Sequence, residues 1–171
     1  FPAVSDVLCV GGFGTHGTRA ANFAVQNADW ILSVGSRLDS KATGTPRDYF
    51  ARAAAVFMVD IDPAEIRKFG GTLGRVFCGV QADARMFLRD MIAEVRRGGS
   101  WPNFGAWLMQ CAEWRRRYPA CRPEYEAEER VNPYIFVKSL SEYCQPGEII
   151  VSDTGLSLGW MMQGFEFRQD Q

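Results

Sequence analysis

Apolar and polar positions along the first hundred residues form short apolar runs separated by segments with helical spacing. The apolar runs predict three buried strands, at residues 31–34, 56–61 and 76–80. Helical spacing predicts a helix over 18–28, a short helix around 47–54, and two further helices that begin after Asp62 and Asp83. Both aspartates are typical N-cap residues, and Pro63 suits the first turn of a helix.

This alternation of strand and helix predicts the fold class. Continuous apolar strands joined by helical crossovers are typical of a parallel sheet that is covered by helices on both faces. We therefore expect an α/β fold with a doubly wound, Rossmann-like parallel sheet and flanking helices. Three strands make about half of a usual doubly wound domain, so we expect this sheet to be incomplete.

The composition of the chain changes after Gly98. A tryptophan-rich helix ends in the basic run 115–117, and an acidic, proline-containing linker follows over 119–131. A further helix begins at Asn132, an apolar strand is predicted over 148–151, and another helix over 156–165. We interpret these elements as the start of a second α/β domain, because one strand cannot bury both of its own faces.

Composition narrows the possible functions. The chain has 171 residues, of which 47% are hydrophobic and 23% charged, as in ordinary globular domains. Its 19 basic and 20 acidic side chains leave no basic excess for nucleic acid. No apolar run reaches the roughly 18 residues that a membrane span needs. The five cysteines are widely spaced without a C-x-x-C pair, which predicts neither a disulfide framework nor a metal site and favours a reducing cytoplasm.

Three glycines near the beginning of the chain form a G-x-G-x-x-G pattern. Gly12, Gly14 and Gly17 follow an apolar segment and precede a predicted helix, and Asp39 lies further along. This matches a dinucleotide-binding fingerprint, in which glycines let a diphosphate approach and an acid binds the ribose. A tight turn into a helix accounts for the same glycines without a ligand. An NAD- or other nucleotide-binding Rossmann module is therefore our alternative function.

The loops that follow the predicted strands carry a second candidate site. Arg37 and Asp39 follow the first strand, Asp60 ends the second, and Asp83 follows the third. Open parallel sheets bind ligands beyond the carboxyl ends of their strands. Arg37 can bind a phosphate through its guanidinium, and Asp60 can accept a hydrogen bond from a ribose hydroxyl. Arg37 can equally pair with either Asp39 or Asp60. Asp62 and Asp83 can serve as helix caps alone.

A third candidate site lies near the end of the chain. Asp153, Thr154 and Gly155 follow the last predicted strand, and Ser157 begins the next helix. Backbone N–H groups and the helix dipole at such a place suit a diphosphate. An ordinary turn from strand to helix accounts for these residues equally well.

Taken together, these stretches resemble thiamine-diphosphate enzymes of the acetolactate synthase type (acetohydroxyacid synthase large subunit). The opening of that family's diphosphate-binding domain is similar to V-S-D-T-G at 151–155 with Trp160. The blocks occur in the family's order and cover most of the chain except about 98–131. The segments similar to the family's central domain are G-T-H-G-T at 14–18, A-D at 28–29, V-G-S-R-L-D at 34–39, T-G at 43–44, V-D-I-D at 59–62 and D-A at 83–84.

The resemblance implies a set of cofactor-binding residues, with no catalytic residue and no metal ligand in this chain. The diphosphate-binding turn of the family corresponds to Thr154, Gly155 and Ser157. The flavin-contacting loops of its central domain correspond to His16, Gly17, Gly35, Arg37, Asp60, Ile61, Asp83 and Ala84.

The resemblance also implies domain boundaries. We expect the C-terminal half of the central domain over 1–97, a helix and interdomain linker over 98–131, and the N-terminal part of the diphosphate-binding domain over 132–171. The glutamate that activates the cofactor and the G-D-G…N metal motif have no matching segment here. We therefore expect a fragment that is inactive by itself.

The parent enzyme that the resemblance implies is a transferase or lyase that decarboxylates a 2-oxo acid such as pyruvate and joins the product to an acceptor. Thiamine diphosphate and Mg²⁺ would be its cofactors, because the cofactor carries this chemistry. Acetolactate synthases proper bind FAD on the central domain, whereas other family members bind a different nucleotide there or none, so FAD is one candidate ligand of this domain. The expected partners are the 2-oxo acid, the remaining domains and further copies in a homo-oligomer in the cytoplasm, with neither nucleic acid nor membrane.

Overall fold

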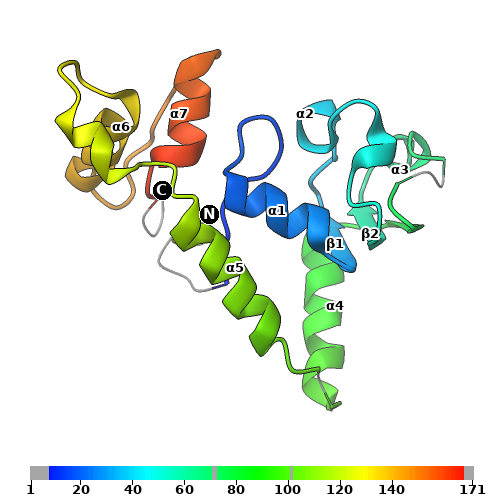
Figure 1. The fold of residues 1–171 in the computed structure, drawn as a ribbon. Helices are drawn as coiled ribbons and strands as arrows, with labels where there is room; N and C mark the ends of the chain where they lie inside the picture. Colours follow the sequence, from blue (N-terminus) through cyan, green and yellow to red (C-terminus); the bar gives the residue numbers. More distant parts are fainter. Residues whose placement is uncertain (1–7, 71–72, 101, 168–171) are drawn as a thin grey trace. The chain divides into compact units, whose positions relative to one another are not determined.

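A computed structural model describes residues 8–70, 73–100 and 102–167 (Figure 1). By its contacts the chain divides into two compact units. One consists of residues 25–103 and is called the sheet unit below. The other combines residues 1–24 with 104–171 and is called the terminal unit.

The sheet unit is built on a three-stranded parallel sheet in the order β1-β2-β3. Its strands are β1 (Trp30–Val34), β2 (Ala55–Asp60) and β3 (Val76–Gln81). Val34 lies opposite Val59, and Asp60 lies opposite Gln81, so all three strands end at the same edge. The three predicted strands and the α/β class with a parallel sheet are thereby confirmed.

The core of the sheet unit surrounds the central strand. Met58 and Val59 of β2 are neighbours in sequence, point to opposite faces, and are both buried. A strand between two others and covered on both faces needs a continuous apolar run, which is what the sequence supplies. Further buried side chains of the sheet unit are Leu38, Phe50, Ala51, Ala54, Val56, Phe69 and Leu73.

The helices of this unit are short except for one. They are α2 (Ser40–Thr43), α3 (Pro63–Arg67) and α4 (Ala84–Arg97), together with the 3₁₀ turn η1 (Arg47–Tyr49). The helix predicted around 47–54 is thus limited to a 3₁₀ turn. Ala51 takes a left-handed φ of 43° and accepts a hydrogen bond from the N–H of Ala54, which turns the chain directly into β2.

Helix α3 lies very close to the sheet. It packs against β2 and β3, and it lies close to the backbone of β3 at Gly79. A Cβ added at Gly79 would lie 2.1 Å from Cγ2 of Ile66 on α3. The absence of a side chain at this one position therefore sets the distance between α3 and the strand beneath it.

The helix predicted over 18–28 is α1 (Arg19–Asn27). The terminal unit contains α5 (Gly105–Arg117), the 3₁₀ turn η2 (Pro123–Ala127), α6 (Pro133–Tyr143) and α7 (Leu156–Gly164). Helices α6 and α7 pack together around Val137, Cys144 and Phe165. As predicted, Asn132 caps α6 and accepts a hydrogen bond of 2.9 Å from the N–H of Tyr134.

The strand predicted over 148–151 is wrong for the described residues. This segment forms no strand, and the side chains of Ile149 and Val151 are 90% and 89% exposed. An apolar run becomes a strand only where a neighbouring strand takes up its N–H and C=O groups, and the described part of the terminal unit contains none.

No helix in the described ranges combines the length and the apolar character that crossing a membrane requires.

Candidate functional site

The loops that follow β1, β2 and β3 meet at the carboxyl edge of the sheet. The N–H of Gly35 donates a hydrogen bond of 2.8 Å to the carbonyl of Val59, which continues the pairing of β1 with β2 by one residue. A Cβ added at Gly35 would lie 3.9 Å from the Cβ of Ala84, at the start of α4. The loop after β1 and the helix after β3 are therefore neighbours above the end of the central strand.

The backbone after β1 is strained. Gly35, Arg37 and Leu38 have φ angles of 61°, 59° and 47°, in the left-handed region. This region costs a residue other than glycine roughly 1–2 kcal/mol. Leu38 is buried in the core, and burial of a leucine side chain contributes about 1.5–3 kcal/mol, so its packing can hold the turn in place.

Asp39 closes this turn as the N-cap of α2. Its Oδ1 accepts hydrogen bonds of 2.9 and 3.1 Å from the N–H groups of Lys41 and Ala42. Its carbonyl accepts a further bond of 3.0 Å from the hydroxyl of Thr43. The acid that the dinucleotide fingerprint would assign to a ribose is thus engaged in starting a helix.

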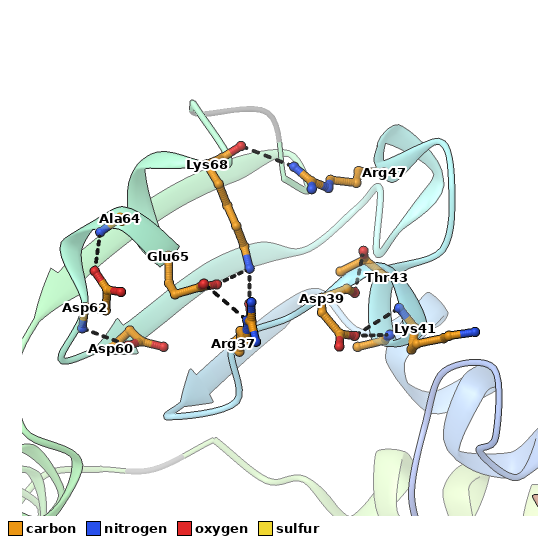
Figure 2. A network of polar contacts seen from close by, with 11 residues as sticks. Arg37, Asp39, Lys41, Thr43, Arg47, Asp60, Asp62, Ala64, Glu65 and Lys68 are labelled. Carbon is orange, nitrogen blue, oxygen red and sulfur yellow. Dashed lines mark hydrogen bonds and ion pairs between the residues drawn. The ribbon is translucent and has the colours of Figure 1, made fainter. Parts of the chain in front are cut away.

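Arg37 pairs with a residue of α3 rather than with either aspartate that the sequence suggested (Figure 2). Its Nε lies 3.2 Å from Oε1 of Glu65. The second carboxylate oxygen of Glu65 binds Nζ of Lys68, and this Nζ also donates a hydrogen bond of 2.6 Å to the carbonyl of Arg37. The carboxylate and the ammonium therefore hold both the side chain and the backbone of Arg37.

The charge state of Glu65 follows from these contacts. The hydrogen bond from Lys68, and then the positive charges of Lys68 and Arg37, lower the pKa of the Glu65 carboxyl despite partial desolvation. The residue is therefore ionised at neutral pH. Glu65 and Lys68 were not among the site residues predicted from the sequence, although their i, i+3 spacing on a helix is typical of an ion pair.

Asp60, the last residue of β2, is bonded to the loop that follows it and to the loop that follows β3. It is 9% exposed, and its Oδ1 accepts a hydrogen bond of 2.9 Å from the N–H of Asp62. Its carbonyl accepts a bond of 3.1 Å from the N–H of Ala82, after β3. The following Ile61 is exposed, as a residue that contacts a ligand would be.

The two expected helix caps are confirmed. Oδ1 of Asp62 accepts a hydrogen bond of 2.7 Å from the N–H of Ala64, and Oδ1 of Asp83 accepts one of 3.0 Å from the N–H of Met86. Both carboxylates thus satisfy N–H groups at helix starts, which in the first turn have no partner within the helix.

His16 and Gly17 belong to the terminal unit, in a tight turn before α1. The N–H of Gly17 donates to the carbonyl of Gly14 at 3.0 Å, and the N–H of Thr18 donates to that of Gly12 at 2.9 Å. A Cβ at Gly17 would lie only 2.4 Å from the carbonyl oxygen of Gly12. The glycine pattern therefore has the steric reason expected of a tight turn into a helix.

The same turn lies against α7. Cδ2 of His16 is 3.8 Å from the place where a Cβ of Gly159 would stand. Thr154, Gly155 and Ser157 are at the beginning of this helix. The N–H of Thr154 donates to Oδ1 of Asp153 at 2.7 Å, and the hydroxyl of Ser157 donates to carbonyls of the same turn.

The terminal unit also contains a cavity of about 530 Å³ that the sequence did not indicate. Apolar groups form most of its lining, and Arg115, Lys138 and Glu166 are its charged residues. Within the described ranges, no three His, Cys, Asp or Glu side chains are grouped so that they could hold a metal ion.

The fold and the edge define a class of protein: an α/β chain with a parallel sheet whose strand ends present an arginine and a buried aspartate. Comparison with known families agrees with this class. Residues 3–91, more than half of the 171, match the family described as thiamine pyrophosphate enzyme, central domain. The chain therefore belongs to the thiamine pyrophosphate enzymes, through their central domain.

Curated relatives extend the similarity beyond the central domain. The chain is 34% identical to the acetolactate synthase large subunit of Parasynechococcus marenigrum, over 93% of the chain and 24% of that protein. It is 32% identical to a probable acetolactate synthase large subunit of Methanocaldococcus jannaschii, over 93% of the chain and 27% of that protein. It is 30% identical to the acetolactate synthase isozyme 2 large subunit of Escherichia coli, over 90% of the chain and 26% of that protein.

The chain thus spans about a quarter of the length of these curated relatives. Their names agree with the resemblance that the sequence blocks indicated. They do not favour the alternative of an NAD-binding module built on Gly12, Gly14, Gly17 and Asp39.

Proposed function

We propose that this chain forms part of a thiamine-diphosphate-dependent enzyme that decarboxylates a 2-oxo acid such as pyruvate and joins the two-carbon product to an acceptor. The family match and the acetolactate synthase relatives support this activity for the parent protein. In this proposal, residues 1–97 belong to the central domain, 98–131 to the linker and 132–171 to the start of the diphosphate-binding domain.

We propose that the carboxyl edge of the sheet binds FAD or a similar nucleotide. A dinucleotide presents a diphosphate and ribose hydroxyls, and the edge has groups that suit both. The guanidinium of Arg37 is on a side chain that is 71% exposed, and Asp60 offers a carboxylate at the end of the central strand. Gly35 leaves room beside Ala84, where any larger residue would place a side chain.

The described residues suit thiamine diphosphate and Mg²⁺ less well than they suit a nucleotide. In the described conformation, one N–H and one hydroxyl of the turn before α7 are engaged by Asp153 and Thr154. A diphosphate would have to replace these contacts of Thr154 and Ser157, and contacts of thiamine diphosphate with Thr154, Gly155 and Ser157 stay a prediction. The described residues also supply no ligand cluster for Mg²⁺.

The observation that carries the nucleotide part of the proposal is the exposed Arg37 at the strand ends, and it can be tested in the full-length protein. Flavin fluorescence should show FAD binding, and Arg37→Ala should weaken it about 10- to 100-fold, because a hydrogen bond to a charged group contributes roughly 1.5–3 kcal/mol. Arg97→Ala removes an exposed arginine of α4 and is the matched control. Equal affinity of the Arg37 variant and the wild type would contradict the proposal.

The activity itself needs a separate assay. The full-length protein should convert two pyruvate molecules to acetolactate and CO₂ when thiamine diphosphate and Mg²⁺ are present. A polypeptide of these 171 residues alone should form none, since it spans only about a quarter of the relatives. Failure of the full-length protein to release CO₂ from pyruvate or any other 2-oxo acid would refute the proposed activity.

We also propose that the parent protein is a homo-oligomer in the cytoplasm. Strand β1 is an edge of the described sheet, and Trp30 at its start is exposed. Exposed edge strands and large apolar side chains favour self-association of this chain, whose sheet we expect to be incomplete. The homo-oligomer of the parent protein is a prediction from the resemblance alone. Light scattering on the full-length protein should give a mass of at least two subunits, and a monomer at high concentration would contradict this part.

A further inference from the structure

We propose that Glu65 and Lys68 are positioning residues that hold Arg37 ready for an anionic ligand; this inference rests on the proposed nucleotide site. Neither residue has to touch the ligand. They act on Arg37 from α3 and from its C-cap residue, which follow a different strand. The proposal assigns a function in binding to a pair that would otherwise be read as a surface ion pair.

The first support is the backbone of Arg37. Strained left-handed residues persist only where the surrounding structure holds them in place. Three contacts hold the residues on either side of Arg37: Gly35 bonds to Val59 of β2, Leu38 is buried, and Asp39 caps α2. The hydrogen bond from Nζ of Lys68 is made to the carbonyl of Arg37 itself, by a residue 31 positions further along the chain.

The second support is the side chain of Arg37. Glu65 engages Nε, the donor closest to the backbone, while most of the side chain is exposed. A guanidinium has five N–H donors, and the remaining four are on the two terminal nitrogens. A pair at Nε therefore fixes the direction of the side chain and is compatible with a two-pronged contact to a phosphate by the terminal nitrogens.

The third support is the low exposure of the Glu65–Lys68 pair. The side chains of Glu65 and Lys68 are only 21% and 23% exposed, in contrast to the Glu94–Arg97 pair on α4, which has the same spacing but is 67% and 73% exposed. Arg47 binds the carbonyl of Lys68 at 3.2 Å, and the ammonium of Lys68 lies 5.0 Å from the ring centre of Phe69. The lysine is thus held by its own surroundings and can in turn hold Arg37 (Figure 2).

The experiment is a double-mutant cycle in the full-length protein, with FAD as the probe and ADP as a second one. Lys68→Met keeps most of the aliphatic chain but removes the bonds to the Arg37 carbonyl and to Glu65. It should weaken FAD binding about three- to ten-fold, the effect expected when one long side chain must be ordered on binding. Lys68→Arg should recover part of this loss, and Glu94→Gln, which breaks the exposed pair, should have no effect.

The decisive comparison is made in the Arg37→Ala background. If Lys68 acts through Arg37, then Lys68→Met should cause little further loss of FAD affinity once the guanidinium is gone. An equal loss in both backgrounds would overturn the inference and would leave the proposed nucleotide site intact. Amide hydrogen exchange gives a readout that needs no ligand: Lys68→Met should speed exchange at residues 36–39 and leave β2 unchanged.

The same experiment separates failure of the site from failure of the inference. If the wild-type protein binds neither FAD nor ADP, the proposed nucleotide site is wrong, and the binding function of the pair fails with it. Unchanged exchange at residues 36–39 in Lys68→Met would overturn the inference on its own, whatever the wild type binds.

Discussion

Replacement of Gly17 by alanine should open the turn that precedes α1. The added Cβ would lie 2.4 Å from both the carbonyl oxygen of Gly12 and Cα of Phe13. Both are backbone atoms, so the contact cannot be relieved by rotation of a side chain. The turn would have to widen by about 1 Å to reach ordinary van der Waals distance.

The cost follows from what the widening breaks. The bond from the Gly17 N–H to Gly14 and the bond from the Thr18 N–H to Gly12 both span the turn, and each contributes about 0.5–1.5 kcal/mol. Asn22 is bonded to both the N–H and the carbonyl of Gly14, at 2.8 and 3.1 Å, and resists the movement. Overpacking of this kind costs about 1–3 kcal/mol, so we expect a local loss of about 2 kcal/mol.

Amide hydrogen exchange of Gly17→Ala measures this loss where it occurs. The N–H groups at positions 17 and 18 should exchange about thirty times faster than in the wild type, the factor that corresponds to about 2 kcal/mol. Gly12→Ala is the matched control, because its Cβ would be 3.6 Å from the end of Met162, an ordinary contact. Equal protection in the two variants would refute the steric argument.

Three further predictions concern single side chains. Asp62→Ala removes the cap of α3 and should lower the free energy of unfolding by about 1 kcal/mol in denaturant titrations. The lowered pKa of Glu65 means that its contribution to stability is present above the ordinary carboxyl pKa and is lost as the pH falls through the lowered value, so Glu65→Gln should show a smaller loss of stability on acidification. Burial raises the pKa of the Cys111 thiol, so iodoacetamide at pH 8 should alkylate the exposed Cys78 first in a mass-spectrometric time course. The first prediction fails if Asp62→Ala is as stable as the wild type, and the second if Glu65→Gln loses as much stability on acidification as the wild type. The third fails if Cys111 and Cys78 are labelled at equal rates.

The sheet unit could be predicted from sequence because its signals are local. Apolar runs placed the three strands, and the aspartates after them placed the starts of α3 and α4. Since parallel strands end at one edge, the residues after them had to gather there, as Gly35 and Ala84 do. The similarity to known enzymes was likewise visible in the order of short sequence blocks.

What the sequence did not predict depends on contacts between distant segments. The partner of Arg37 is on α3, and the sequence suggested nearer aspartates because their distance along the chain is all that a pattern shows. The failure at 148–151 has the same origin: an apolar run has strand character, but pairing depends on a neighbour that the run itself does not specify.

Replacement of Gly79, the residue of β3 that lies beneath α3, tests how the proposed nucleotide site is held in place. A Cβ at Gly79 would be 2.1 Å from Cγ2 of Ile66, a β-branched side chain that has little freedom to turn away. Gly79→Ala should therefore push α3 off the sheet and break the 2.6 Å bond from Lys68 to the Arg37 carbonyl. FAD affinity should fall without any change to a residue that faces the ligand. Adding Ile66→Ala removes the clashing atom and should restore much of the affinity, whereas Gly99→Ala, which meets no atom within 4 Å, should change nothing. If Gly79→Ala binds FAD as tightly as the wild type, the position of α3 does not matter to the site.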